Sequence, residues 1–188
     1  EAGAHGVMYL PFVCGCAVLA AVQRAIIEFP GMGADVDQDR YCLKWPNDVW
    51  VFRQGERGKI AGVLVESEIR GSVMRVGLGI GLNWRGVPKV DKPAASLFSG
   101  VVPEPFHFAR FLVPELNIRL KDLFSSGADA VLTEFRSHDC TAGRSVQYAG
   151  KRYTSAGIDN EGALILADQG GRTITVMDTA TELELVDP

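Results

Sequence analysis

Three short segments of this sequence combine residue types that could do chemistry at one site. The first is Lys44-Trp45-Pro46-Asn47-Asp48, in which a lysine, an amide and a carboxylate stand close together after an apolar run. Such a set could bind an anion, a ureido-like hydrogen-bonding group and a metal ion. Asn and Asp after a proline also form turns without any further role. This segment alone therefore leaves both interpretations open.

The second segment, 58–66, places a glycine inside an apolar run that begins with a lysine. Gly62 lowers the stability of a strand, and such a glycine often marks the close approach of a ligand or of another backbone. Lys59, at the start of the run, could meet a phosphate or a carboxylate as a point charge. A solvated lysine beside a β-bulge would give the same pattern.

The third segment is Gly77-Leu78-Gly79-Ile80-Gly81-Leu82-Asn83. Side chains alternate between the two faces of a strand, so three glycines at alternate positions leave one face bare. A planar ligand could lie on that floor. The spacing matches neither the dinucleotide-binding fingerprint nor the phosphate-binding loop. A twisted or bulged strand is the alternative interpretation.

The spacing of apolar residues predicts which elements carry these segments. It indicates a buried helix across 7–29 and a second helical region across 105–136 that Gly127 interrupts. Between them we expect an antiparallel meander of four strands with short connections, at 41–45, 49–52, 60–69 and 73–82. The three candidate segments all fall on this meander, which makes a shared site plausible.

The character of the chain changes after Ser137. Five short strands separated by tight turns are expected at 144–149, 153–158, 163–168, 172–176 and 182–186. Five short strands in about 50 residues are typical of a small barrel. The sequence therefore predicts an α+β body over residues 1–136 and a small all-β domain over residues 137–188.

Composition excludes several classes of protein. The 188 residues are 47% hydrophobic and 22% charged, as in soluble globular proteins, and the net charge of −4 argues against nucleic-acid or anionic-membrane partners. The most apolar stretch, 7–29, is interrupted by proline and charged residues, so we expect a buried helix and no membrane span. The four cysteines have no zinc-site spacing. We interpret them as reduced thiols of a cytoplasmic protein.

The order of the three segments resembles the biotin protein ligase family, whose members attach biotin to carrier proteins. The segments that carry the resemblance are Lys-Trp-Pro-Asn-Asp, Lys-Ile-Ala-Gly-Val-Leu-Val-Glu and Gly-Ile-Gly-Leu-Asn, and 143–146 and 157–166 are similar to the family's SH3-like C-terminal domain. The resemblance covers nearly the whole chain. It implies an α+β fold in which a class II synthetase-like mixed or antiparallel sheet with helices is followed by a small SH3-like β-barrel.

The resemblance also implies an enzyme that uses biotin, ATP and Mg²⁺. Biotin and ATP would give biotinyl-AMP, and a lysine of a biotin carboxyl carrier domain would then accept the biotin. Lys59 and Asp48 would be catalytic: Lys59 would be the cation at the carboxylate and α-phosphate, and Asp48 would contact magnesium. Asn47 would orient the reacting groups together with Asp48, and Lys44 would support that cluster. The remaining implied substrate-binding residues are Gly62, Leu64, Gly79 and Gly81 along the biotin pocket and Asn83 at the adenylate.

The sequence departs from the family at its beginning. The family's Ser/Thr segment and Gly-Arg-Gly-Arg loop do not occur in these residues, so we expect an N-terminally incomplete catalytic domain, and a DNA-binding domain is not expected either. We also expect self-association, as in a homodimer. Two alternatives stay open: a lipoate-type ligase or transferase on the same fold, and a non-catalytic carrier-binding or dimerising remnant of a ligase.

Overall fold

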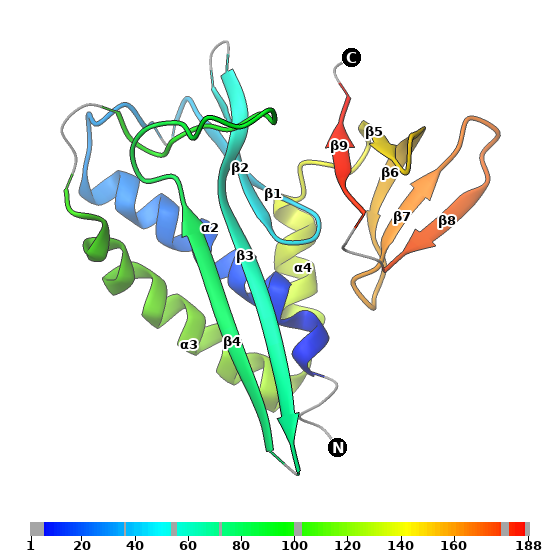
Figure 1. Ribbon diagram of the computed structural model, residues 1–188, viewed down its shortest axis with the longest axis horizontal. Helices are drawn as coiled ribbons and strands as arrows, with labels where there is room; N and C mark the ends of the chain where they lie inside the picture. Colours follow the sequence, from blue (N-terminus) through cyan, green and yellow to red (C-terminus); the bar gives the residue numbers. More distant parts are fainter. Residues whose placement is uncertain are drawn as a thin grey trace.

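Two antiparallel sheets and a layer of helices make up the computed structural model, which describes residues 6–35, 37–53, 56–71, 73–99, 103–177 and 181–186 (Figure 1). The first sheet has the order β1-β2-β3-β4. Its strands are β1 (Arg40–Lys44), β2 (Asp48–Arg53), β3 (Glu56–Arg70) and β4 (Val73–Leu82). All three strand pairings are antiparallel, which confirms the predicted meander.

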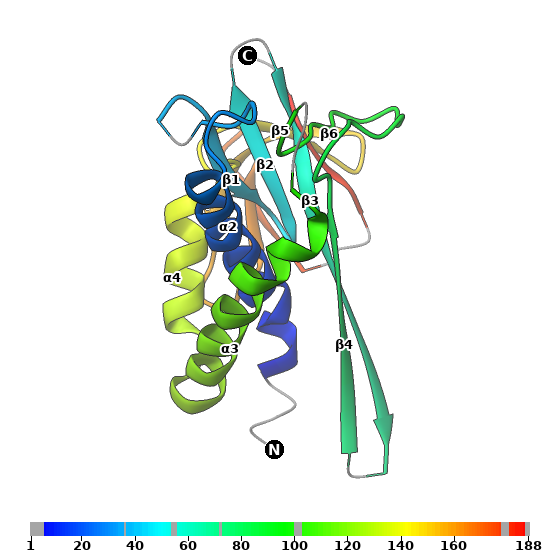
Figure 2. The same ribbon diagram turned by 90° about the vertical axis from the view of Figure 1, so that its left-hand side faces the viewer.

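The helical elements lie on one face of the first sheet, as the side view shows (Figure 2). They are the 3₁₀ turn η1 (Val7–Tyr9), α2 (Leu10–Glu28), the 3₁₀ turn η2 (Pro105–Phe108), α3 (Ala109–Ser126) and α4 (Asp129–His138). Helix α2 contacts β1, β2 and β3 as well as the other two α-helices. It is therefore the central element of the hydrophobic core.

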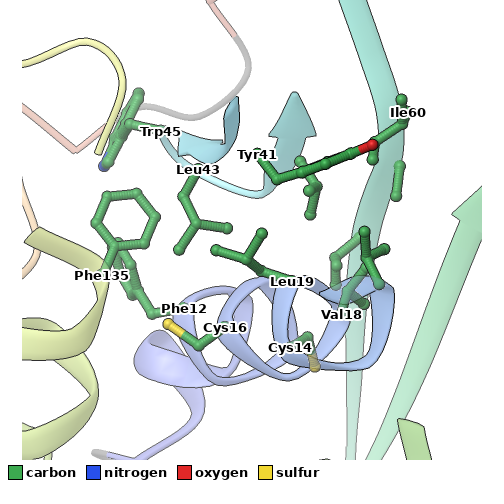
Figure 3. Close-up of a cluster of buried hydrophobic side chains, with 14 of the residues drawn as sticks. Phe12, Cys14, Cys16, Val18, Leu19, Tyr41, Leu43, Trp45, Ile60 and Phe135 are labelled. Carbon is green, nitrogen blue, oxygen red and sulfur yellow. The ribbon is translucent and has the colours of Figure 1, made fainter. Parts of the chain in front are cut away.

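Helix α2 shows why the most apolar stretch of the chain is buried. Pro11 lies in its first turn, where a missing N–H costs nothing, and the helix ends at Glu28, with Phe29 as its C-cap before Pro30-Gly31. Leu43 of β1 and Ile60 of β3 belong to the same buried cluster as Leu19 of the helix, and Figure 3 shows Leu43 and Leu19 side by side. The segment Val7–Glu28 is long and apolar enough to cross a membrane, but most of it is buried inside the fold.

Gly127 separates the last two helices, as predicted. Its φ of 88° lies in the left-handed region that favours glycine, and its N–H bonds to the carbonyl of Leu123 at the end of α3. Arg119 of α3 then ties the two helices together, because it bonds to Glu134 of α4 at 2.6 Å and 3.0 Å. The two helices form one layer with α2.

The second sheet follows α4 and has the order β8-β7-β6-β5-β9. Its strands are β5 (Ser145–Tyr148), β6 (Lys151–Ile158), β7 (Leu164–Ala167), β8 (Thr173–Val176) and β9 (Leu183–Leu185). All five lie where the sequence predicts strands, and all pair antiparallel. Between the described edge strands β8 and β9 no closing pair is present. The α+β class with antiparallel sheets is thus confirmed.

The second sheet packs against β1 and β2 of the first. A small buried cluster joins Cys42 and Trp50 of the first sheet to Cys140, and Leu185 of β9 packs on it. The N–H of Cys140 also donates to the carbonyl of Leu43 at 2.8 Å. The two sheets share a hydrophobic core in this way, and the division into domains at residue 137 stays a prediction.

Candidate functional site

The three candidate segments meet in one row across the first sheet. Lys44 at the end of β1 pairs with Asp48 at the start of β2, Asp48 pairs with Gly62 of β3, and Gly62 pairs with Gly81 of β4. Residues that pair directly across antiparallel strands have their side chains on the same face. The row therefore places a lysine, a carboxylate and two glycines side by side.

Lys59 reaches into this row from one side. Its Nζ lies 2.5 Å from Oδ1 of Asp48, and its side chain is 44% exposed. A Cβ at Gly62 would lie 2.5 Å from Nζ and 2.7 Å from Cε of Lys59. Position 62 must therefore be glycine for the lysine to lie over the strand and meet the aspartate. This packing explains the glycine that the sequence marks as unusual inside a strand.

Lys44 is the buried cation of the row. It is only 6% exposed, and its Nζ lies 5.5 Å from the ring centre of Trp50. Burial lowers the pKa of Lys44, because the charged form loses water, while the charge of nearby Asp48 opposes this shift. A positive charge on Lys44 therefore costs free energy at this buried position, and the charge of Asp48 offsets part of that cost.

An open cleft of about 830 Å³ lies along β3 and β4 beside this row. Leu64 pairs with Gly79 in the same register that joins Gly62 to Gly81, so these four residues share the exposed face. A Cβ at Gly81 would meet nothing within 4 Å. Lys59 and Asn83 also line the cleft. The bare floor predicted from the alternating glycines is therefore present, with a cation at one end.

The amide groups of the two predicted asparagines are already engaged with the backbone. Asn47 donates from Nδ2 to the carbonyl of Val63 at 2.5 Å, and its own carbonyl accepts the N–H of Val63 at 3.0 Å. Asn83 donates from Nδ2 to the carbonyls of Lys59 and Ala95, at 3.1 and 3.0 Å. Both amide nitrogens hold the backbone around Lys59 and Asp48. Because Nδ2 of Asn83 is already engaged, only its Oδ1 could contact a ligand.

A second cleft of about 300 Å³ adjoins the first on the other side of Lys59. Lys59, Lys92 and Pro93 line both clefts. The smaller cleft is completed by strand β9, and Lys92 forms an ion pair with Glu182 there. The sequence gives little signal for these residues, since 84–104 has no regular period and 182–185 is far away in the chain.

The chemistry of a metal at this site can be judged from the acids around it. In the part of the chain that the structure describes, no group of three or more His, Cys, Asp or Glu could hold a metal ion. Magnesium, however, is commonly held by one or two carboxylates together with substrate phosphates and water. Asp48 and Asp91, which both line the smaller cleft, could supply these one or two carboxylates. They could not hold the ion without phosphate oxygens and water.

The sequence model of the biotin/lipoate A/B protein ligase family matches residues 5–83, which include every predicted site residue from Lys44 to Asn83. This part of the chain is therefore similar to that family in sequence. A biotin–[acetyl-CoA-carboxylase] ligase of Paracoccus denitrificans is 29% identical, over 93% of this chain and 72% of that protein. The similarity to this relative extends beyond residues 5–83 into the second sheet.

Solved structures share the fold of both sheets and of the helices. The biotin protein ligase of Aquifex aeolicus superimposes with a TM-score of 0.72 at 22% identity, covering 96% of this chain and 76% of that one. Its complex with biotin and ATP gives 0.73 at 22% identity, with 95% and 72% covered. A biotin protein ligase-like protein of unknown function from Silicibacter sp. TM1040 gives 0.67 at 13% identity, with 92% and 72% covered. At these identities the likeness concerns the fold.

Proposed function

We propose that this chain is a biotin protein ligase, which joins biotin to ATP as biotinyl-AMP and transfers the biotin to a lysine of a carboxylase carrier domain. The observation that carries the proposal is the Lys59–Asp48 pair at the end of a glycine-floored cleft. The family match, the name of the Paracoccus relative and the biotin and ATP bound to the Aquifex enzyme support it.

The cleft suggests how biotin would lie. Its fused rings would rest on the exposed face formed by Gly62, Leu64, Gly79 and Gly81, where side chains leave room and Leu64 adds apolar contact. Its carboxylate would then point toward Lys59. The adenylate would extend toward Asn83, which lines the same cleft. The positive charge of Lys59 selects a ligand with an anionic group at this end.

In the first step a carboxylate oxygen of biotin attacks the α-phosphorus of ATP, a P–O bond forms, and pyrophosphate leaves with the electrons of the broken bond. Lys59 would oppose the negative charge shared by the carboxylate and the phosphate, which is the kind of fixed electrostatic stabilisation that lowers such barriers most. Asp48 and Asn47 hold Lys59 and the turn in place. Bound Mg²⁺, held by Asp48 and phosphate oxygens, would neutralise phosphate charge.

In the second step the neutral amine of the carrier lysine attacks the acyl carbon of biotinyl-AMP. An amide bond forms, the bond to the phosphate oxygen breaks, and AMP leaves while the amine loses a proton. Lys59 would again stabilise the charge that returns to the phosphate. The open cleft, with Lys59 44% exposed at its edge, leaves room for a lysine side chain to approach.

The test is biotin-dependent exchange of labelled pyrophosphate into ATP, together with calorimetry of biotin, ATP and biotinyl-AMP binding. Replacing Lys59 with Ala should slow the exchange by about 30- to 1,000-fold, equivalent to about 2–4 kcal/mol of transition-state stabilisation. Lys89→Ala is the matched control, because Lys89 is an exposed lysine of the nearby loop that does not line either cleft.

Two results would contradict the proposal. Exchange that Lys59→Ala leaves unchanged would remove Lys59 from the reaction. Calorimetric binding of biotinyl-AMP with no exchange by the unaltered chain would favour a non-catalytic carrier-binding module. The family also includes lipoate ligases, so the same assay is run with lipoate in place of biotin. Faster exchange with lipoate would identify lipoate, and not biotin, as the substrate.

A further inference from the structure

A hydrogen bond joins the site turn to the second sheet. The indole Nε1 of Trp45 donates to the carbonyl of Gly162 at 3.0 Å, across 117 positions of sequence. Trp45 is only 2% exposed, so this bond is shielded from water. Its chain neighbours are Lys44 and Pro46, which belong to the site segment. The turn that carries the proposed site is therefore in direct contact with the β6–β7 turn.

The β6–β7 turn is itself held firmly. Oδ1 of Asp159 accepts the N–H groups of Glu161 and Ala163, each at 2.9 Å. Arg136 of α4 donates to the carbonyls of Ile158 and Asp159 at 3.2 and 2.6 Å. These bonds fix the path of the backbone on both sides of Gly162. The acceptor of the Trp45 bond is thus positioned from helix α4 and not by its own hairpin alone.

Gly162 is also seated against the helix core. Its φ is +84°, and an added Cβ would lie 2.8 Å from the ring of Phe12. Phe12 in turn packs edge-on against Phe135 of α4, with ring centres 4.9 Å apart. In Figure 3 Trp45 lies beside Phe135 and Phe12 at one end of the core. Any side chain at position 162 would push the turn away from the ring of Phe12.

On its other side the same segment is attached to β3. Asn47 exchanges two hydrogen bonds with Val63, and Asp48 pairs with Lys59. The segment 45–48 is therefore held between the β6–β7 turn and strand β3. A shift of Trp45 must move Asn47 and Asp48, because they follow it by two and three positions in the same short turn.

We propose that Trp45 is a positioning residue: through its bond to Gly162, the second sheet fixes the turn that holds Asp48 against Lys59. The positioning role of Trp45 rests on the function proposed above. The physical coupling between the two turns does not depend on that function. The second sheet therefore helps to hold the proposed site in place. It also gives the tryptophan of the Lys-Trp-Pro-Asn-Asp segment a role that is separate from ligand contact.

The test compares two glycines that sit in tight turns of the same sheet. Gly162 and Gly171 both have positive φ, at 84° and 79°, so alanine strains both backbones alike. An added Cβ meets Phe12 at Gly162 but nothing within 4 Å at Gly171. Only Gly162→Ala should therefore displace the acceptor of the Trp45 bond. Gly171→Ala serves as the matched control for strain and for general loss of stability.

The readout is hydrogen exchange of the Val63 amide and of the Trp45 indole N–H, followed by NMR. We expect both to exchange about tenfold faster in Gly162→Ala than in Gly171→Ala, the scale for loss of one buried hydrogen bond. The indole of Trp84, which donates to Pro103 at 2.7 Å, should be unchanged and serves as an internal reference. Trp45→Phe should speed Val63 exchange by a similar factor.

Equal Val63 exchange in Gly162→Ala and Gly171→Ala would overturn the proposal, even if the Trp45 signal changed. If Gly162→Ala and Trp45→Phe do not fold, Arg136→Lys gives the same test more mildly, since it loosens the β6–β7 turn without altering the core. Its control is Arg119→Lys, because the partners of Arg119 among the described residues, Glu115 and Glu134, both lie in the helix layer.

Catalysis supplies a second readout. In biotin-dependent pyrophosphate exchange, Gly162→Ala should lower kcat about tenfold while the KM for biotin stays within about twofold, because the floor of the cleft is untouched. A higher KM with unchanged kcat would contradict a positioning role. If the unaltered chain shows no pyrophosphate exchange, the proposed function fails. The hydrogen-exchange comparison then still decides the coupling between the turns.

Discussion

The first sheet has a covered half and an open half. In β1 and β2, Leu43, Val49 and Val51 are fully buried, because helix α2 covers one face and the cluster around Cys140 covers the other. Toward the end of β3 and in β4, the face with Leu64 and Gly79 is exposed. One continuous sheet therefore has a buried side that stabilises the fold and an open side that carries the proposed ligand surface, and the site row crosses the boundary at Gly62.

The largest effect on stability should come from creating a cavity in the covered half of the sheet. Ile60 of β3 is fully buried, so Ile60→Ala should lower the free energy of unfolding by about 3–4 kcal/mol through lost burial and a cavity. Ile69→Ala on the same strand is the control, because Ile69 is 67% exposed, and it should cost less than about 0.5 kcal/mol. Urea unfolding measures both. Similar losses would mean that the two halves are equally covered in solution.

The open half should respond in binding and not in stability. Gly81→Val adds a side chain where nothing lies within 4 Å, so the fold accepts it, but the floor of the cleft is filled. Biotin affinity by calorimetry should fall about 10- to 100-fold, the scale of a steric clash of about 1–3 kcal/mol. Gly77→Val is the control, since Gly77 alternates on the same strand but lies outside the cleft. Equal losses would place the ligand elsewhere.

Lys44, in the covered half of the sheet, should make the stability of the fold depend on pH. Burial lowers its pKa in the folded state, so the unfolded state binds more protons between that lowered pKa and the ordinary value of 10.5. The free energy of unfolding should therefore rise as the pH increases through this window. Lys44→Met should remove the rise, because methionine has no proton to lose on folding. Urea unfolding from pH 7 to 10 measures this change.

The pKa of Lys92 shifts in the opposite direction, so Lys92 is the control for Lys44. Its hydrogen bond to Glu182 raises its pKa, so its contribution to stability is present below pH 10.5 and is lost as the pH rises through the folded-state pKa. Lys92→Met should therefore leave the rise below pH 10 in place. A rise that persists in Lys44→Met would assign it to another group.

Local patterns were enough to predict most of the fold. The antiparallel meander, the break at Gly127 and the five strands of the second sheet follow from apolar period and turn residues, which act over a few positions. The site row also follows partly from the sequence, since Gly62, Gly79 and Gly81 are unusual inside strands. Their side-by-side arrangement depended only on hairpin register, which short connections fix.

Long-range contacts of irregular segments could not be predicted in this way. The segment 93–98 runs beside Lys59 and Asn83, yet it has no period that would indicate a strand. The partner of Trp45 lies in a turn 117 positions away, and the partner of Lys92 lies 90 positions away. Such contacts depend on how finished elements pack together, and no local signal in one sequence records that.

The approach of the segment 93–98 to Gly58 has a consequence for how much the loop before it can vary. A Cβ at Gly58 would lie 2.5 Å from the backbone of Ala94, so the two chains touch there directly. Asn83 and Ala95 both bond to the carbonyl of Lys59, at 3.1 and 3.0 Å. The loop 84–94 therefore leaves and returns at one peptide group. Residues inserted into it lengthen a closed ring whose ends stay fixed, and doubling such a loop costs only about 0.6 kcal/mol. The loop can thus grow or shrink by insertion and deletion while the lysine beneath it keeps its place.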